Sequence, residues 1–192
     1  MHVWHKLLAT IAAIILLCLL RLYINPSEDY GEARVGGVFT LTDTHGNTIR
    51  DTDFRGRLML VYMGYSHCPD ICPMTLTVMS EAMKALGPNA RKIAVIFISL
   101  DPERDTPQAL GSYLNSFDPR IIGLTGSSKA INEAAKAYKV FYKKSSTPGA
   151  GSYLVDHSGF LYLMDGNGRY IMHFGPDVKA DGLVRAIREH FQ

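Results

Sequence analysis

From Gly36 onward, runs of hydrophobic residues follow one another at the spacings of an α/β domain. Two runs are continuously apolar, as expected of strands that are buried on both faces of a sheet. They are 58–65, LMLVYMGY, and 93–100, IAVIFISL. Shorter apolar segments bounded by turn residues predict further strands. These lie at 38–43, 48–51 and 121–126, with a hairpin over 160–174 whose turn is at 165–168.

Between the strands, apolar residues recur at helical spacing, which predicts amphipathic helices. Pro73 opens one of them, and Gly87-Pro88 ends it. Other helices are predicted at 106–117, 127–138 and 177–191. The segment 136–144, KAYKVFYKK, indicates a strand edge with solvated lysines. The order predicts one sheet with flanking helices over 36–192, entered by an N-terminal β-hairpin and carrying an insertion after the second buried strand.

The first 24 residues follow a different pattern. Residues 7–20, LLATIAAIILLCLL, carry no charge and would rise about 21 Å as a helix. The apolar residues on either side extend this to about 33 Å, enough for a hydrocarbon layer of roughly 30 Å. Small residues at the −3 and −1 positions are missing after the run, so we expect an uncleaved signal anchor at 1–24 rather than a cleaved peptide. Polar residues with Pro and Gly make 25–35 a linker.

Composition narrows the class of partner. The chain has 192 residues, 47% of them hydrophobic, which is enough for one globular core. The formal net charge is +2, and the basic residues are scattered rather than gathered into a stripe. Nucleic acid is therefore not an expected partner.

The segment YSHCPDICP, 65–73, carries the candidate chemistry. Its Cys68 and Cys72 stand between a buried strand and the next helix, which is the thioredoxin arrangement. A helix N-terminus favours the thiolate form, which is both the nucleophile and the metal ligand. The spacing alone leaves three readings open: a structural disulfide, a redox couple or a metal site. Two soft thiolates would select Cu(I), with Zn(II) the main competitor. They would need at least one more ligand, for which imidazole is the natural candidate.

Of the seven histidines, His157 has the most informative position. It precedes the strand GFLYLM, and in a thioredoxin-like sheet the loop before that strand lies against the cysteine loop. His67 adjoins Cys68 but points away if the segment is extended. A lone loop histidine is usually a surface residue, so the position alone does not assign it.

Taken together, YSHCPDICP and YLVDHSGFLYLMD resemble the Sco/SenC family of membrane-anchored, thioredoxin-like copper proteins that help assemble the dinuclear copper centre of cytochrome c oxidase. FISLDPERDTP, 97–107, and the entry hairpin GGVFTLTDTHGNTIRDTDFRGR resemble further family signatures. The resemblance implies a copper site at Cys68, Cys72 and His157. It implies a supporting role, rather than ligation, for Asp101.

By this resemblance, we expect a copper metallochaperone that holds Cu(I), and also Cu(II) with an additional ligand. Its expected partners are the copper-site subunit of the oxidase, an extracytoplasmic copper donor and a thiol reductant. The alternative is an extracytoplasmic thiol-disulfide oxidoreductase that keeps the oxidase cysteines reduced through Cys68 and Cys72. A peroxidase ranks third, because the paired CP motifs and His157 do not fit a single peroxidatic cysteine.

The expected location follows from the anchor. Nothing at the N-terminus resembles an Arg- and Ser-rich transit peptide, so a bacterial inner membrane is favoured over a mitochondrial one. We expect a single pass with the domain facing the periplasm.

Overall fold

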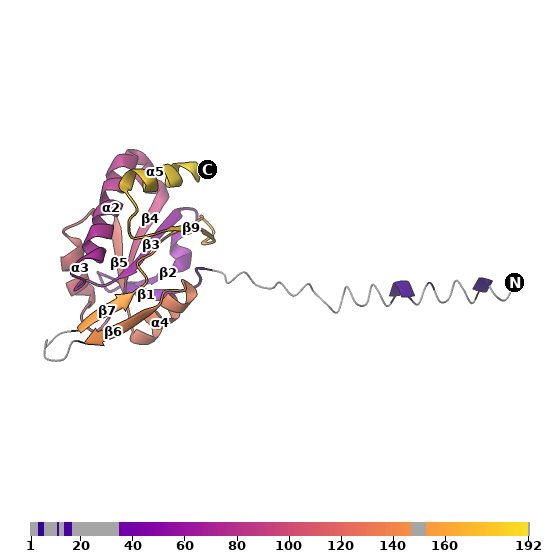
Figure 1. Cartoon of the computed structure of the whole chain (residues 1–192), viewed down its shortest axis with the longest axis horizontal. Coiled ribbons are helices and arrows are strands. Elements are labelled where there is room, and N and C mark those ends of the chain that lie inside the picture. Colours follow the sequence, from indigo (N-terminus) through magenta and orange to yellow (C-terminus); the bar gives the residue numbers. More distant parts are fainter. Residues whose placement is uncertain (1–3, 6–10, 12–13, 17–34, 147–152, 192) are drawn as a thin grey trace. The chain divides into compact units, whose positions relative to one another are not determined.

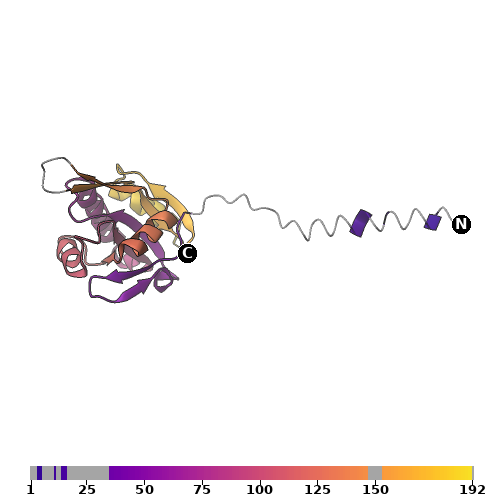
Figure 2. The same cartoon turned by 90° about the horizontal axis from the view of Figure 1, so that it is seen from below.

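The computed structural model describes residues 4–5, 11, 14–16, 35–146 and 153–191. Figures 1 and 2 show the chain in two views related by a 90° turn. Its contacts divide the chain into two compact units, 1–33 and 34–192. Within the described ranges, no helix combines the length and the apolar character needed to cross a membrane. The expected anchor at 1–24 and the linker at 25–35 lie mostly outside those ranges and stay predictions.

The second unit is built on a seven-stranded mixed sheet with the order β2-β1-β5-β4-β3-β8-β9. At its centre, β3 is parallel to β4 and β4 is parallel to β5. The outer strands run antiparallel to their neighbours. The strands are β1 (Thr40–Asp43), β2 (Thr48–Arg50), β3 (Leu58–Gly64), β4 (Ile93–Ser99), β5 (Ile121–Thr125), β8 (Leu161–Met164) and β9 (Tyr170–Phe174).

Two further strands form a separate hairpin, visible in Figure 1 beside the main sheet. They are β6 (Tyr142–Ser146) and β7 (Tyr153–His157), and they pair antiparallel with each other. Backbone hydrogen bonds to other strands therefore do not fix the position of this hairpin on the domain.

Helices cover both faces of the main sheet. They are α2 (Ile71–Leu86), α3 (Pro107–Leu114), α4 (Ser128–Ala137) and α5 (Ala180–Glu189), with short 3-10 turns η1 (Asp51–Phe54) and η2 (Gly87–Lys92). α2 packs against α5. The ring of Tyr113 from α3 contacts Phe97, whose register partner in β3 is Tyr62, so α3 lies on the same face as Tyr62.

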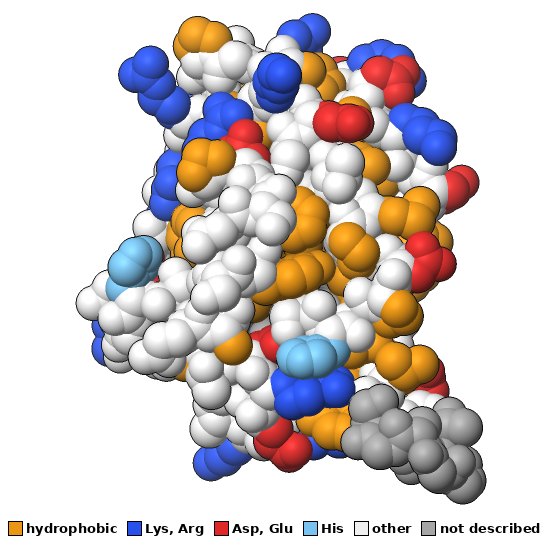
Figure 3. Space-filling view, turned by 90° about the vertical axis from the view of Figure 1, so that its left-hand side faces the viewer, with side chains coloured by type: hydrophobic (Ala, Val, Ile, Leu, Met, Phe, Trp, Pro, Cys, Tyr) orange, Lys and Arg blue, Asp and Glu red, His pale blue; other side chains and the backbone are white. Residues whose placement is uncertain are grey.

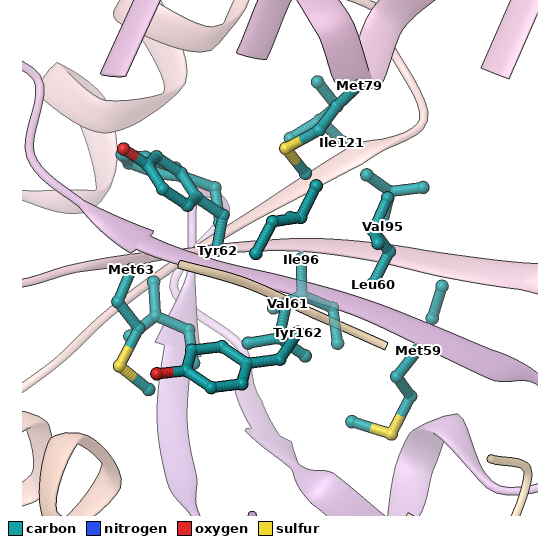
Figure 4. Packing of buried hydrophobic residues seen from close by; sticks show 14 of the residues in the cluster. Met59, Leu60, Val61, Tyr62, Met63, Met79, Val95, Ile96, Ile121 and Tyr162 are labelled. Atoms are coloured by element: carbon teal, nitrogen blue, oxygen red, sulfur yellow. The ribbon is translucent and has the colours of Figure 1, made fainter. Parts of the chain in front are cut away.

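The core lies on both sides of β3 and β4, whose residues are all buried. Figure 4 shows Tyr62 and Met79 on one side of β3, and Met63 and Tyr162 on the other. Tyr138, which follows α4, packs edge-on against Tyr162 and so closes the second face. Burial of β3 on both faces explains why its sequence is continuously apolar.

The sequence predictions for the main sheet are confirmed to within a few residues. β3 and β4 are the two expected buried strands, and β1–β2 and β8–β9 are the two expected hairpins. α2 begins at Ile71, two residues before the predicted Pro73. Ser127 accepts a hydrogen bond from the Ala130 backbone N–H and caps α4.

One prediction was wrong, and another holds only in part. His157 was expected in a loop opening the next strand, but it is the last residue of β7. In β7 only Val155 is buried, so the segment lacks the apolar run that marks a strand. The expected strand edge at 136–144 is in part the end of α4, and only its last residues belong to β6.

Candidate metal centre

Strand β3 and helix α2 position the two cysteines. β3 ends at Gly64, and a short loop carries Cys68, whose backbone N–H donates to the Tyr65 carbonyl at 3.3 Å. α2 then begins at Ile71, which places Cys72 in its first turn, where backbone N–H groups are unpaired. The Cys72 N–H donates to the Cys68 sulfur at 3.4 Å. Both cysteines are free thiols; Cys72 is fully buried and Cys68 is 9% exposed.

The β6–β7 hairpin delivers His157. Its Nδ1 lies 3.2 Å from the Ser158 carbonyl oxygen. Because a carbonyl only accepts, Nδ1 is the donor of this bond, and in the neutral imidazole Nε2 then carries the lone pair that can bind a metal. Nε2 faces the cysteines, 3.5 Å from Cys72 Sγ. The rings of Tyr62 and Tyr65 contact the imidazole edge-on, with centroids 6.2 and 6.0 Å away.

The two sulfurs and an imidazole nitrogen of His157 all lie within 4.8 Å of one another. Among the described residues, these three side chains form the one group of His, Cys, Asp and Glu that could bind a single metal ion together. With bonds of roughly 2.0–2.3 Å, as thiolate and imidazole make to zinc, three ligands around one ion stand about 3.5–4 Å apart. The Cys72–His157 separation fits this geometry.

Two other sequence candidates lie outside the group. His67 is exposed and its Nδ1 lies 2.9 Å from the Ser66 hydroxyl. It stands in a turn rather than in the extended segment for which its direction was predicted. Asp101 is fully buried and accepts a hydrogen bond from the Tyr153 hydroxyl at 2.6 Å. This carboxylate bonds protein groups, in agreement with the supporting role that the resemblance implies.

The two thiols differ in proton affinity. A hydrogen bond from Cys72 lowers the pKa of Cys68 to about 3, although partial burial opposes the shift. The same bond, together with burial, raises the pKa of Cys72 well above its usual range. Without a metal, the pair therefore holds one proton between two sulfurs, with the negative charge on the more exposed one.

The sequence analysis did not identify two residues that lie close to the sulfurs. The Tyr62 hydroxyl donates toward Cys72 Sγ at 3.7 Å. A Cβ at Gly64 would lie 2.6 Å from Cys72 Sγ, so only glycine leaves room for this sulfur. A glycine inside a buried apolar strand is the signal that could have marked this close approach.

The site is open at the surface. His157 is only half-buried, and Met74 and Phe160 beside the two ligand segments are 56% and 39% exposed. Figure 3 shows one face of the molecule, on which hydrophobic side chains gather near the centre. Most charged side chains on this face lie toward its edges, although a His and charged side chains also lie just below the hydrophobic patch. A soft, partly exposed ligand set suits a metal that is taken up and passed on.

Comparisons with known proteins agree with this chemistry. The SCO1/SenC family model matches residues 27–192. The chain is 42% identical over 164 residues to protein sco1 of Schizosaccharomyces pombe, a match that covers 84% of this chain and 62% of that protein. It is 39% identical over 166 residues to an SCO2-like protein of Rickettsia conorii, covering 86% and 80%.

A solved structure is also similar. The structure of Bradyrhizobium japonicum ScoI with copper bound has a TM-score of 0.77 and 39% sequence identity. The match covers 82% of this chain and 99% of that one. The mixed sheet with flanking helices is therefore thioredoxin-like, as the sequence predicted.

Proposed function

Because the chain belongs to the SCO1/SenC family, we propose that it is a copper chaperone for cytochrome c oxidase assembly. Copper is its cargo, held by Cys68 Sγ, Cys72 Sγ and His157 Nε2. The observation that carries the proposal is the meeting of these three atoms within 4.8 Å, although they come from two separate segments of the chain. The copper-bound relative from Bradyrhizobium japonicum supports the choice of metal.

The ligand set accounts for the choice of oxidation state. Two thiolates and one imidazole give a three-coordinate site of soft and borderline ligands, which suits Cu(I). Cu(II) prefers more ligands and is held with an additional one. The proton shared by the sulfurs leaves when the metal binds, so uptake releases a proton. Transfer then proceeds by exchange of ligands with a recipient.

The proposed recipient is the oxidase subunit that carries the dinuclear copper centre. An extracytoplasmic copper donor loads the site, and a thiol reductant restores the cysteines after oxidation. We propose that residues 1–24 anchor the chain once in a bacterial inner membrane, with the domain in the periplasm. The uncharged run at 7–20 supports this part of the proposal.

A second function has its own support in the asymmetry of the thiols. A thiolate at Cys68 beside a protonated Cys72 is the arrangement of a dithiol reductant. Cys68 would attack a substrate disulfide, and Cys72 would then displace the substrate thiol. The substrate gains two electrons, and a Cys68–Cys72 disulfide remains for a reductant to reopen.

An anaerobic Cu(I) titration of the reduced full chain in detergent, against a competing chelator, tests the first function. We expect one copper per chain, lost in Cys68→Ser/Cys72→Ser and weakened about 100-fold in His157→Ala, since removing a ligand costs at least as much as removing a ligand's partner. Binding indifferent to His157 would contradict the three-ligand site. If His157→Ala also kept full activity in reducing an oxidised partner thiol pair, the reductase would become the leading function.

A further inference from the structure

The segment that follows β4 contacts both ligand-bearing parts of the site. It comprises residues 101–105, DPERD, and is called the bracket below. Backbone N–H groups of Arg104 and Asp105 donate to the Asp101 carbonyl at 3.2 and 2.9 Å, which folds the bracket into a tight turn. Its two aspartates are fully buried. Buried carboxylates are costly unless they are paired, so their partners identify what the turn holds.

On one side the bracket holds the cysteine loop. The Asp105 carboxylate accepts a hydrogen bond from the Ser66 backbone N–H at 3.0 Å and a second one from the Ser66 hydroxyl. It also accepts one from the Ser99 hydroxyl at the end of β4. Ser66 stands two residues before Cys68, so this carboxylate ties the start of the cysteine loop to the sheet.

On the other side the bracket holds the hairpin. The Tyr153 hydroxyl donates to Asp101 Oδ1 at 2.6 Å, and Arg104 Nη1 donates to the Tyr153 carbonyl at 3.0 Å. The Arg104 guanidinium lies over the Tyr153 ring, 3.7 Å from its centroid, and also bonds Asp101. Tyr153 is thus held at its hydroxyl, its ring and its backbone by two residues of one turn.

Tyr153 and His157 are the first and last residues of β7. Residues two and four apart in a strand point to the same face, so both side chains and the buried Val155 share one face of the hairpin. Since β6 and β7 pair only with each other, side-chain contacts decide how this face lies on the domain. Because Tyr153 and His157 share this face, the contacts of Tyr153 with the bracket also set the orientation of the imidazole.

We propose that Asp101, Arg104 and Tyr153 are positioning residues that hold the His157 imidazole against the cysteine pair. The inference rests on the proposed copper function and adds the device that completes the three-ligand site. Breaking the contact leaves the two thiolates in place but lets the third ligand move away from them.

Tyr153→Phe is the sharpest test, because it removes one hydroxyl and keeps the ring. In the Cu(I) titration of the full chain we expect about tenfold weaker binding, in the range typical of residues that orient a metal-ligating histidine. The nitrogen hyperfine pattern in the electron paramagnetic resonance spectrum of the Cu(II) form should weaken as it does in His157→Ala. Asp101→Asn should act in the same direction. Tyr142→Phe is the matched control: Tyr142 pairs with His157 across the hairpin, but among the described residues its hydroxyl makes no hydrogen bond to the bracket.

A double-mutant cycle separates positioning from general destabilisation. In the His157→Ala background, Tyr153→Phe should change copper affinity less than twofold, because no imidazole remains to be positioned. An equal loss in both backgrounds would overturn the inference, as would wild-type affinity in Tyr153→Phe. Absence of any His157 effect would instead contradict the proposed function, and a separate measurement keeps the inference testable in that case.

That measurement needs no copper. Nuclear Overhauser contacts between the His157 and Tyr65 rings should be present in the reduced, metal-free wild type and in Tyr142→Phe. In Tyr153→Phe they should fall by more than about half. Unchanged contacts would show that the imidazole keeps its place without the Tyr153–Asp101 hydrogen bond and would overturn the inference.

Discussion

At the scale of single residues, the two cysteines are chemically unlike although they share one motif. Cys68 lies near the surface, accepts hydrogen bonds and has a lowered pKa, whereas Cys72 is buried in the first turn of α2 and has a raised one. The sequence CPDIC does not show this difference. The hydrogen bond from Cys72 to Cys68 is the largest cause of the difference, and the deeper burial of Cys72 adds to it.

The shift at Cys68 has a measurable pH dependence. An ordinary cysteine, with a pKa near 9.0, alkylates about ten times faster for each added pH unit below that value. Cys68, with its pKa lowered to about 3, is already a thiolate, so its rate with iodoacetamide should be nearly flat between about pH 5 and pH 8. Cys72 should react far more slowly. Mass spectrometry of the reduced, metal-free chain after short pulses measures both rates.

The control for this experiment is Cys72→Ala, because alanine removes the hydrogen-bond donor, whereas a serine hydroxyl would still donate. The largest cause of the lowered pKa is the hydrogen bond from Cys72, so replacing its thiol should move the pKa of Cys68 upward and restore a rate that climbs with pH. A steep rate in the wild type would contradict the assigned thiolate.

At the scale of elements, the main sheet could be predicted from sequence and the hairpin could not. Because β3 and β4 are buried on both faces, their sequences are continuously apolar, and both strands could be predicted from the sequence. β6 and β7 form a two-stranded sheet in which only Val155 of β7 is buried, and residues 147–152 separate the strands, so neither an apolar run nor a short turn marks them.

The site was predicted unevenly for the same reason. Cys68 and Cys72 are marked by a dense local motif, whereas His157 was assigned only through resemblance, because its contact with Cys72 spans 85 positions. The bracket and Tyr153 both belong to motifs that resemble the family, but the contact between them was not predicted. No local pattern in the sequence indicates which hydroxyl reaches a buried carboxylate.

The separate hairpin should also exchange hydrogen differently from the main sheet. Amides of β6 and β7 have one sheet partner each and cover little apolar surface, so in the metal-free chain they should exchange well before those of β3 and β4. Copper joins His157 to the cysteines and should slow exchange in the hairpin by about tenfold or more while leaving β3 unchanged. Hydrogen exchange read by mass spectrometry measures this, and in His157→Ala the copper effect should disappear.

At the scale of the whole molecule, copper should stabilise the fold only to the extent that the folded chain binds it more tightly than the unfolded chain does. Cys68 and Cys72 are close in sequence and can share Cu(I) even when the chain is unfolded, whereas His157 joins them only in the native state. A tenfold preference for the native site is worth about 1.4 kcal/mol, which raises the melting temperature of a chain this size by roughly 3–6 °C.

Calorimetry of the reduced chain with and without Cu(I) checks this. The shift should fall to less than half in His157→Ala. An undiminished shift in that variant would mean that the cysteines alone distinguish the folded from the unfolded chain.

Because the imidazole is carried by its own small sheet, it can leave the metal separately from the sulfurs when copper is transferred to a recipient. A tethered ligand acts through its effective concentration at the metal, and that concentration depends on how tightly the tether is held. A recipient that displaces the hairpin lowers the effective concentration of the imidazole at the metal without disturbing the seven-stranded sheet or the sulfurs. The copper then faces two thiolates and an open position, so the incoming ligand enters before any outgoing sulfur leaves, and the ion need never be released into water.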